Sequence, residues 1–245
     1  MNPFFFGRST RQLFGAYEPP GPANRDLGVV LCPPLGDEHV FAHPTYRLLA
    51  RQLAAAGCHV LRFDYYGTGD SAGDFEETSQ IDWQGDIDTA ITELMDVGQV
   101  SRVALVGMRL GATLAAQVAN SRSEIDQLVL WDAIDNGNEY LVEIRASPAA
   151  PDETVDACGL GVTPRARQDI GSITLDTFGP PLPRTLIVTT TAASTDHEAL
   201  WARLVSAGVE CSPLHSPDTM AWKERPVGTG AMPVNTLRKI VAWLL

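Results

Sequence analysis

The sequence predicts an α/β fold with a doubly wound, mostly parallel sheet. Apolar, β-branched segments of strand length alternate with amphipathic helical segments along most of the chain, and this alternation is typical of parallel strands joined by crossover helices. The apolar run Val103–Val106 also leads into Gly-x-Arg-x-Gly and then into a helical pattern of small residues, Ala112–Ala119. These observations predict about seven or eight strands, covered by helices on both faces.

The strands are predicted from short apolar runs that lie between turn-forming residues. The first two flank a Gly-Arg-Ser-Thr turn and should form a hairpin, whereas the later ones are apolar almost throughout, as expected between two helix layers. The expected strands are 4–6, 13–17, 28–32, 58–63, 103–106, 127–131, 185–190 and 209–214.

The helices are predicted from apolar residues at helical spacing and from residues that begin or end helices. Leu48, Leu49 and Leu53 share one face of a segment that stops at Gly57, and Pro233 suits the first turn of the last helix. The acidic, Gly-rich segment 64–74 is predicted to be a loop. The expected helices are 46–56, 79–97 (apolar face Ile81, Ile87, Ile91 and Leu94), 112–119, 196–207 and 234–245.

Composition excludes several classes of partner. The chain has 30 acidic and 18 basic side chains, and its net charge of −12 repels phosphate backbones and anionic membranes, so we expect no nucleic-acid partner. The apolar runs are too short for a membrane span, and the N-terminus lacks the layout of a signal peptide. The four cysteines are scattered, which favours free thiols and a cytoplasmic location. A homodimer is compatible with the sequence.

The sequence also gives no sign of a metal or a cofactor. It contains no metal-ligand spacing and no Walker loop, and the segment Gly107–Gly111 lacks the third glycine of a dinucleotide fingerprint. We therefore expect neither group.

The regular alternation of strands and helices breaks between residues 132 and 183. This segment is rich in Pro, Gly and Asp, and a new strand begins directly after it. We expect residues 1–131 and 184–245 to form the core, with 132–183 inserted as a cap or lid over the carboxyl edge of the sheet.

The strand–turn–helix at 103–119 has the context of the nucleophile elbow of α/β-hydrolases, whose pattern is Gly-x-Ser-x-Gly. The nucleophile position is occupied by Arg109. A guanidinium stays protonated at any working pH and has no lone pair to offer, so it cannot attack a carbonyl.

Three further segments extend the likeness. Leu31–Glu38, Leu61–Phe75 and Leu130–Asp132 resemble the α/β-hydrolase-fold proteins grouped with serine aminopeptidases and with exosortase-associated hydrolases. The resemblance runs in the same order along the chain from Gly28 to Trp131. Some exosortase-associated members are similar in carrying Arg at the elbow, which would make Arg109 a trait of a subfamily. The motifs are specific for the fold and say little about the substrate.

The resemblance implies an oxyanion hole built from backbone N–H groups. One belongs to Leu110 and the other to Leu35 or Gly36. The family's acid corresponds to Asp132, Asp135 or Asp196, and its histidine to His215, although His215 lacks the usual Gly-His setting and could be an ordinary histidine at a strand end.

Other side chains are expected around the same pocket. His39 and His43 follow Pro34 in a predicted loop near the oxyanion position, and they are alternative polar groups for the site. Tyr65 and Met108 are expected to line the pocket as substrate-binding residues.

Arg109 itself has two interpretations. It could form a salt bridge with Asp132 at the end of the neighbouring strand, because an unpaired buried guanidinium is costly. Alternatively, it could face the pocket and hold a carboxylate or phosphate, or stabilise an enolate or oxyanion. The two roles are compatible if Asp132 and a ligand take different edges of the guanidinium.

Three functions follow from this conflict between fold and nucleophile. The first is an enzyme that lacks the serine nucleophile and acts on a small carbonyl, acyl or carboxylate compound by non-covalent acid–base and oxyanion chemistry, such as cyclisation, dehydration, condensation or water-mediated hydrolysis. The second is a catalytically silent ligand-binding or partner protein. The third is a hydrolase with an unconventional nucleophile such as Ser71 or Cys158, which no spacing supports. The fold cannot choose among them, and we favour the first.

Overall fold

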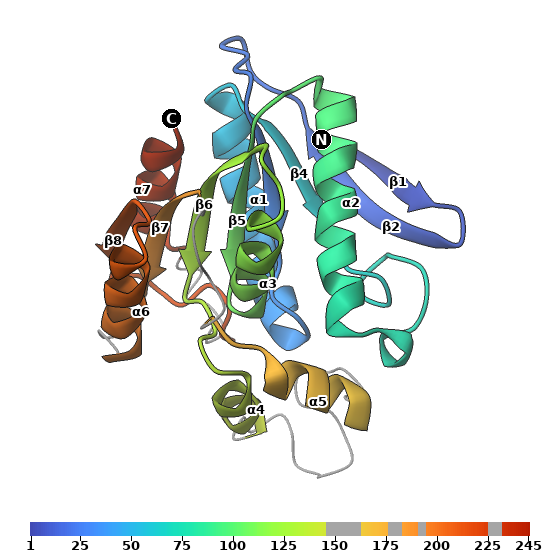
Figure 1. Cartoon of the computed structure of the whole chain (residues 1–245). Coiled ribbons are helices and arrows are strands. Elements are labelled where there is room, and N and C mark those ends of the chain that lie inside the picture. Colours follow the sequence, from blue (N-terminus) through green and yellow to red (C-terminus); the bar gives the residue numbers. More distant parts are fainter. Residues whose placement is uncertain (146–162, 176–182, 191–194, 225–231) are drawn as a thin grey trace.

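The computed structural model describes residues 1–145, 163–175, 183–190, 195–224 and 232–245. Its eight-stranded sheet has the order β1-β2-β4-β3-β5-β6-β7-β8 (Figure 1). The strands are β1 (Asn2–Arg8), β2 (Arg11–Glu18), β3 (Gly28–Cys32), β4 (His59–Phe63), β5 (Val103–Met108), β6 (Ile125–Trp131), β7 (Arg184–Thr189) and β8 (Cys211–His215). β1 and β2 form an antiparallel hairpin, β2 is antiparallel to β4, and all other neighbours are parallel. The mostly parallel sheet is therefore confirmed.

Helices cover both faces of this sheet. The helices are α1 (Asp37–Ala55), α2 (Gln80–Gly98), α3 (Leu110–Ala119), α4 (Gly137–Arg145), α5 (Pro164–Ser172), α6 (Thr195–Ser206) and α7 (Val234–Leu244), with a short 3-10 helix, η1, at Phe75–Glu77. Buried side chains of α2, α3 and α6 belong to one apolar cluster, and those of α1 and α7 belong to the other (Figure 1). Two separate cores on opposite faces are what a doubly wound sheet requires.

Two local predictions were wrong. The first helix begins at Asp37, not at residue 46. Gly36 turns the chain with φ 64°, two acidic residues follow in the first turn, and the helix continues through Pro44, so His39 and His43 lie on a helix and not in a loop. Ile81 is 79% exposed, although it was expected on the apolar face of α2. The buried face of α2 contains Trp83 instead. Trp83 stacks on Phe75 of η1, and this contact turns the first part of the helix so that Ile81 faces outward.

The segment 132–183 is described only in part. α4 and α5 contact each other beyond the carboxyl edge of the sheet (Figure 1). A single antiparallel bridge joins Asn136 to Thr174, and Tyr140 and Ile170 extend the apolar cluster beneath α3. Residues 146–162 and 176–182 lie outside the described residues, so the cap stays a prediction. None of the described helices is long and apolar enough to cross a membrane.

Candidate functional site

The parallel strands bring four turns to one edge of the sheet. The turns that follow β5, β6 and β7 contain Arg109, Asp132 and Thr190, respectively, and Glu38 lies in the first turn of α1, directly after the turn that follows β3. Parallel neighbours end on the same side, so residues far apart in the sequence become neighbours there. The site described below is built from these turns and from α4.

Arg109 occupies the sharp turn between β5 and α3, as predicted. Its φ of 54° and ψ of −126° are unusual for a residue with a side chain. The backbone N–H of Arg109 donates to the Trp131 carbonyl at 2.9 Å, which ties the turn to β6. The backbone N–H of Leu110 begins α3, and no acceptor for it is found among the described residues. Strained turns of this kind occur mainly where the surrounding structure holds a functional group in place.

The Arg109 guanidinium lies between two carboxylates and two aromatic rings. Its Nε donates to Glu38 Oε1 at 3.0 Å, and its Nη2 donates to Glu143 Oε2 at 2.6 Å. Its central carbon lies 3.8 Å from the ring centre of Trp222 and 5.4 Å from that of Tyr140. Burial lowers the pKa of Arg109, but the charges of Glu38 and Glu143 more than offset this effect and hold the pKa above its usual value. Arg109 is therefore a fixed cation.

Glu38 is the deeper of the two carboxylates. It lies in the first turn of α1 with 7% of its surface exposed, and its Oε2 accepts a hydrogen bond from the Tyr140 hydroxyl at 3.0 Å. Burial raises the pKa of Glu38, whereas Arg109 and the Tyr140 hydroxyl offset part of that rise. The pair therefore joins the turn after β5 to the turn after β3 through a buried ion pair.

Asp132 is not the partner of Arg109, so the predicted salt bridge between them was wrong. Its carboxylate accepts hydrogen bonds from the backbone N–H of Thr190 at 2.9 Å, from the Thr190 hydroxyl, and from the Trp222 indole N–H at 3.1 Å. Three donors already satisfy this buried group. Trp222 thus connects the two residues, since its ring contacts Arg109 and its N–H binds Asp132.

A cavity of about 560 Å³ opens above this network. Its lining includes Arg109, Asp132, Trp222, Tyr140 and Glu143. Glu143 has 44% of its side chain exposed, and the Nη1 nitrogen of Arg109 has no acceptor among the described residues. The volume lies within the range of small-molecule sites, roughly 300–1,000 Å³.

The predicted histidines lie elsewhere. His215 ends β8, is exposed, and contacts the Thr189 hydroxyl through Nδ1 at 3.2 Å, while the side chain of Asp196 lies outside the described residues. Among the described residues, no histidine lines the Arg109 cavity. Asp135 does line it, and its Oδ1 accepts from Arg203 at 2.7 Å. The expected pair of an acid and His215 is therefore not found among the described residues that line the Arg109 cavity.

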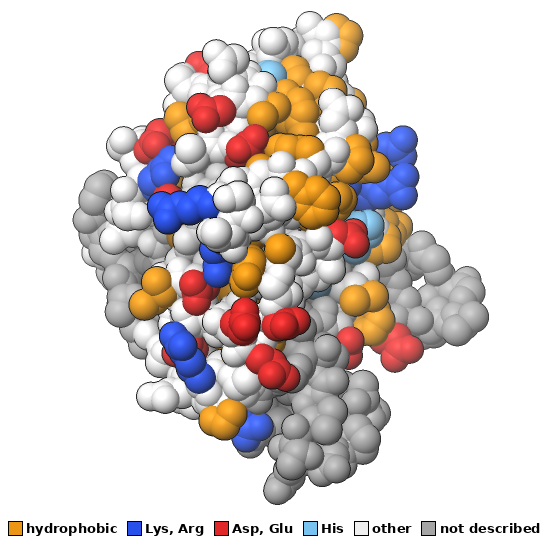
Figure 2. Space-filling model, turned by 90° about the vertical axis from the view of Figure 1, so that its right-hand side faces the viewer, with side chains coloured by type: hydrophobic (Ala, Val, Ile, Leu, Met, Phe, Trp, Pro, Cys, Tyr) orange, Lys and Arg blue, Asp and Glu red, His pale blue; other side chains and the backbone are white. Residues whose placement is uncertain are grey.

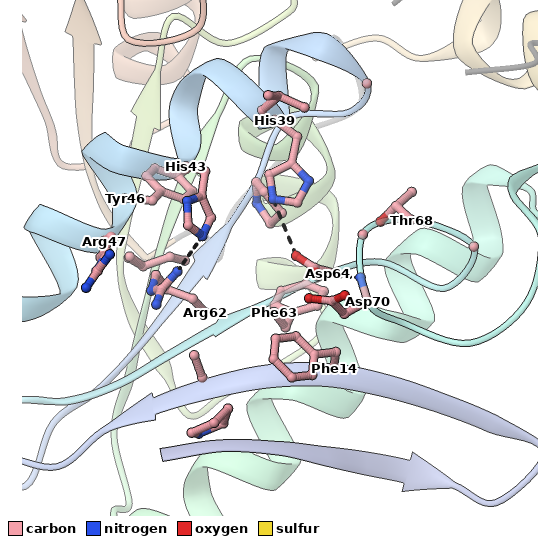
Figure 3. A pocket seen from close by; sticks show the side chains of 18 of the residues that line it. Phe14, His39, His43, Tyr46, Arg47, Arg62, Phe63, Asp64, Thr68 and Asp70 are labelled. Carbon is pink, nitrogen blue, oxygen red and sulfur yellow. Dashed lines mark hydrogen bonds and ion pairs between the residues drawn. The ribbon is translucent and has the colours of Figure 1, made fainter. Parts of the chain in front are cut away.

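His39, His43 and Gly36 line a second cavity, which lies between α1 and the β4–β2 side of the sheet (Figure 3). Burial lowers the pKa of both histidines. The expectation that they line the Arg109 pocket was wrong, because α1 begins early and carries both of them toward β4.

Tyr65 and Met108 are not pocket residues either. Both are fully buried in the apolar clusters on the two faces of the sheet, as are the side chains of Leu35 and Leu110. Met108 is the last residue of β5 and packs into the cluster of α1 and α7, whereas Tyr65 follows β4 and packs into the cluster on the opposite face. For Leu35 and Leu110 only the backbone remains available, which is the role expected of them.

Four residues of the site escaped the sequence analysis: Glu38, Tyr140, Glu143 and Trp222. Glu38 could have been found, since it follows the predicted oxyanion loop and a buried Arg needs a carboxylate. Tyr140 and Glu143 lie on α4, a helix that the sequence pattern did not predict, and Trp222 lies between β8 and α7, where no regular element was expected. Within the described part of the chain, no group of three His, Cys, Asp or Glu residues could hold a metal ion.

Part of the chain matches one protein family, and the whole chain is similar in fold to many solved structures. Residues 36–150 match the family described as Serine aminopeptidase, S33. No curated protein matches the chain in sequence.

Three similar structures illustrate the range of activities. The Bottromycin epimerase BotH, solved in complex with Bottromycin A2, is 19% identical with a TM-score of 0.67, and the match covers 100% of both chains. Est1E from Butyrivibrio proteoclasticus with bound ferulic acid is 15% identical with a TM-score of 0.67, covering 98% of this chain and 97% of Est1E. Protein XC6422 from Xanthomonas campestris, an α/β serine hydrolase without lid, is 15% identical with a TM-score of 0.62, covering 100% and 94%.

Proposed function

Because the chain has the α/β-hydrolase fold and its residues 36–150 match the serine aminopeptidase family, we propose that it is an enzyme of this fold that works without a serine nucleophile. Its substrate is a small compound with a carbonyl, acyl or carboxylate group, and its chemistry is non-covalent. The observation that carries this proposal is Arg109, which occupies the strained turn between β5 and α3, where the family places its nucleophile.

The Arg109–Glu38 ion pair argues against acyl transfer at this turn. It spans the turns after β5 and β3, whose backbone N–H groups bind the oxyanion in hydrolases of this fold. Ser71 does not replace the missing nucleophile, since its hydroxyl accepts from Phe14 N–H at 2.8 Å and donates to the Asp64 carbonyl at 2.6 Å. Cys158 lies outside the described residues.

The cavity favours proton transfer instead. Glu143 is the proton acceptor in this proposal, because its half-exposed carboxylate lines the cavity and Arg109 holds it in place. It takes a proton from a carbon next to the ligand's carbonyl group and returns a proton to the same enolate. The Nη1 of Arg109, the nitrogen with no acceptor among the described residues, donates to the enolate oxygen. The epimerase BotH supports the idea that this fold accommodates chemistry other than hydrolysis.

Two further features support this assignment. α4 and α5, from the proposed cap 132–183, stand beyond the same edge of the sheet and help to line the cavity (Figure 1), and enclosure protects reactive intermediates from water. The ferulic acid held by Est1E supports a small carboxylic or acyl compound as ligand.

The second candidate is a catalytically silent ligand-binding protein. One observation favours it: the Arg109 charge is already matched by two carboxylates and by the Trp222 face. Such a network can be purely structural, so the experiments below must separate binding from turnover.

The first test is labelling with a fluorophosphonate probe, which reports an activated serine. We expect no labelling of the full chain. We also expect the Arg109→Ser variant to remain a poor esterase, because no histidine lines its cavity among the described residues. Stoichiometric labelling of any serine in the wild-type chain would refute the proposal and revive an unconventional nucleophile.

The second test is hydrogen–deuterium exchange at carbon, followed by NMR in D2O over a panel of small acyl and carboxylate compounds. Proton transfer replaces C–H by C–D while ester bonds stay intact. Glu143→Gln should slow this exchange by about 10²-fold or more, since a positioned acid–base group contributes about 10²–10⁴. Glu139→Gln is the matched control, because Glu139 lies on the same helix and lines the same cavity. Ligand binding without any Glu143-dependent exchange would instead support the silent protein.

A further inference from the structure

A second cavity, of about 620 Å³, lies apart from the Arg109 site. It is bounded by one side of α1, by strands β2 and β4, and by the loop that follows β4 (Figure 3). The residues that line it are different from those that line the Arg109 cavity. Its volume is that of a small-molecule site, and the proposed chemistry at Arg109 does not use it.

One end of this cavity is cationic. Arg47, His43 and Arg62 lie together there (Figure 3). The Arg62 guanidinium contacts His43 Nε2 through Nη1 at 3.3 Å and the Met1 sulfur through Nη2 at 3.3 Å, and its Nε is buried without a hydrogen-bond acceptor among the described residues. It forms no ion pair with a described carboxylate; Glu18 and Asp64 act on it only from beyond ion-pair distance.

An arginine in this state is unusual. Arg62 is partly buried, and a guanidinium that is partly removed from water is normally matched by a carboxylate and by hydrogen bonds to its N–H groups, as the more deeply buried Arg109 is in this protein. Burial and the neighbouring Arg47 charge act to lower the pKa of Arg62, whereas the more distant charges of Glu18 and Asp64 act to raise it, so its positive charge is only partly compensated in the empty site. An anionic ligand would supply the missing partner.

The other end is acidic. Asp64 and Asp70 lie there with Thr68, and His39 stands between the two ends with its Nε2 at 3.4 Å from Asp64 Oδ1 (Figure 3). Asp64 Oδ2 also accepts from the backbone N–H of Asp70 at 3.0 Å. A second anionic group on the ligand would meet these carboxylates and be repelled.

Apolar side chains line the rest of the cavity. Phe14 and Phe63 are beside the acidic end in Figure 3, and Ala16, Leu31 and Pro3 also contribute to the lining. The face of the molecule that includes the β1–β2 edge also carries a gathering of hydrophobic side chains next to basic and histidine side chains (Figure 2). Such a surface suits an apolar ligand body rather than an inorganic ion.

We propose that this cavity binds a small organic acid with one carboxylate and an apolar body. The carboxylate binds the Arg62 guanidinium beside Arg47 and His43, and the apolar body lies against Phe14. The acidic end excludes dicarboxylates whose second group reaches Asp64 and Asp70.

The test uses three related probes and calorimetric titration of the full chain. They are 3-phenylpropanoate, its neutral amide, and the dianion 1,4-phenylenedipropanoate. Only the monoanion should bind well, with the amide and the dianion each at least about tenfold weaker, since a charge-assisted hydrogen bond is worth roughly that factor or more. Arg62→Gln should weaken binding of 3-phenylpropanoate by about tenfold or more. Arg8→Gln is the matched control, since Arg8 is exposed on β1 outside the cavity. This variant should bind 3-phenylpropanoate with the affinity of the wild-type chain.

Two further variants keep the test decisive if Arg62→Gln does not fold. His43→Gln alters an exposed side chain of α1 at the cationic end and should weaken 3-phenylpropanoate binding. Asp70→Asn, also exposed, should strengthen binding of the dianion several-fold, a gain that misfolding cannot produce. The proposal is overturned if 3-phenylpropanoate fails to bind, if acid and amide bind equally, or if Arg109→Lys abolishes binding of the acid while Arg62→Gln does not.

Discussion

Arg109→Met is expected to lower the free energy of unfolding by about 3–5 kcal/mol, the usual cost of removing one partner of a buried ion pair. The variant keeps most of the side-chain volume but leaves Glu38, 7% exposed, without its cation. Glu143 is affected less, because 44% of its side chain is exposed and water can replace Arg109. Urea unfolding at neutral pH measures the difference.

A second substitution, made in the Arg109→Met variant, identifies the carboxylate that Arg109 pairs with. Adding Glu38→Gln should recover a large part of the loss, since it removes the unpaired charge. Asp132→Asn is the matched control: it should add its own cost and recover nothing, because Asp132 is bonded to Thr190 and Trp222. Recovery by Asp132→Asn alone would contradict the network described here.

The cost of Arg109→Met should also depend on pH. Without Arg109, burial raises the pKa of Glu38 in the folded state still further above its value in the unfolded chain, which is about 4.5. The unfolded state then loses its proton first as the pH rises. The wild-type chain has the same unfolded state, so the cost of the substitution grows with pH between the folded pKa of Glu38 in the wild type, which is itself raised, and its still higher folded pKa in the variant. A cost that stays the same from acid to neutral pH would mean that Glu38 is not the group left unpaired.

Gly111→Ala is the second change with a large expected effect. A Cβ at Gly111 would collide with the Pro33 carbonyl oxygen and lie 2.5 Å from that of Cys32. Both obstacles are backbone atoms at the end of β3, so α3 or β3 must move. We expect a loss of about 3 kcal/mol in the free energy of unfolding, at the upper end of typical overpacking costs.

Gly85→Ala is the control for this substitution. Gly85 also lies in a helix, but a Cβ there would meet nothing within 4 Å. Alanine should therefore stabilise the chain by about 0.5–1 kcal/mol, the helix-propensity difference between the two residues. Thermal and urea unfolding of both variants give the comparison. Equal effects would show that α3 does not approach β3 as closely as described.

The sequence alone determined the class of fold and the turn at Arg109. The strands and the helix around 103–119 follow from local patterns: β-branched runs buried on both faces, Gly107 and Gly111 beside a tight turn, and small residues where α3 meets β5. Each of these features is decided within one turn or one strand. Sequence patterns therefore predicted them without knowledge of their neighbours.

The tertiary structure decided which charges meet. Arg109 pairs with Glu38, 71 residues away, and with Glu143, 34 residues away, whereas Asp132 binds Trp222 across 90 residues. Asp132 was the expected partner because β5 and β6 end side by side. The guanidinium of Arg109 instead contacts carboxylates on α1 and α4. The early start of α1 likewise moved His39 and His43 into a separate cavity. Such contacts depend on the strand order and on the exact start of a helix, and no local pattern contains that information.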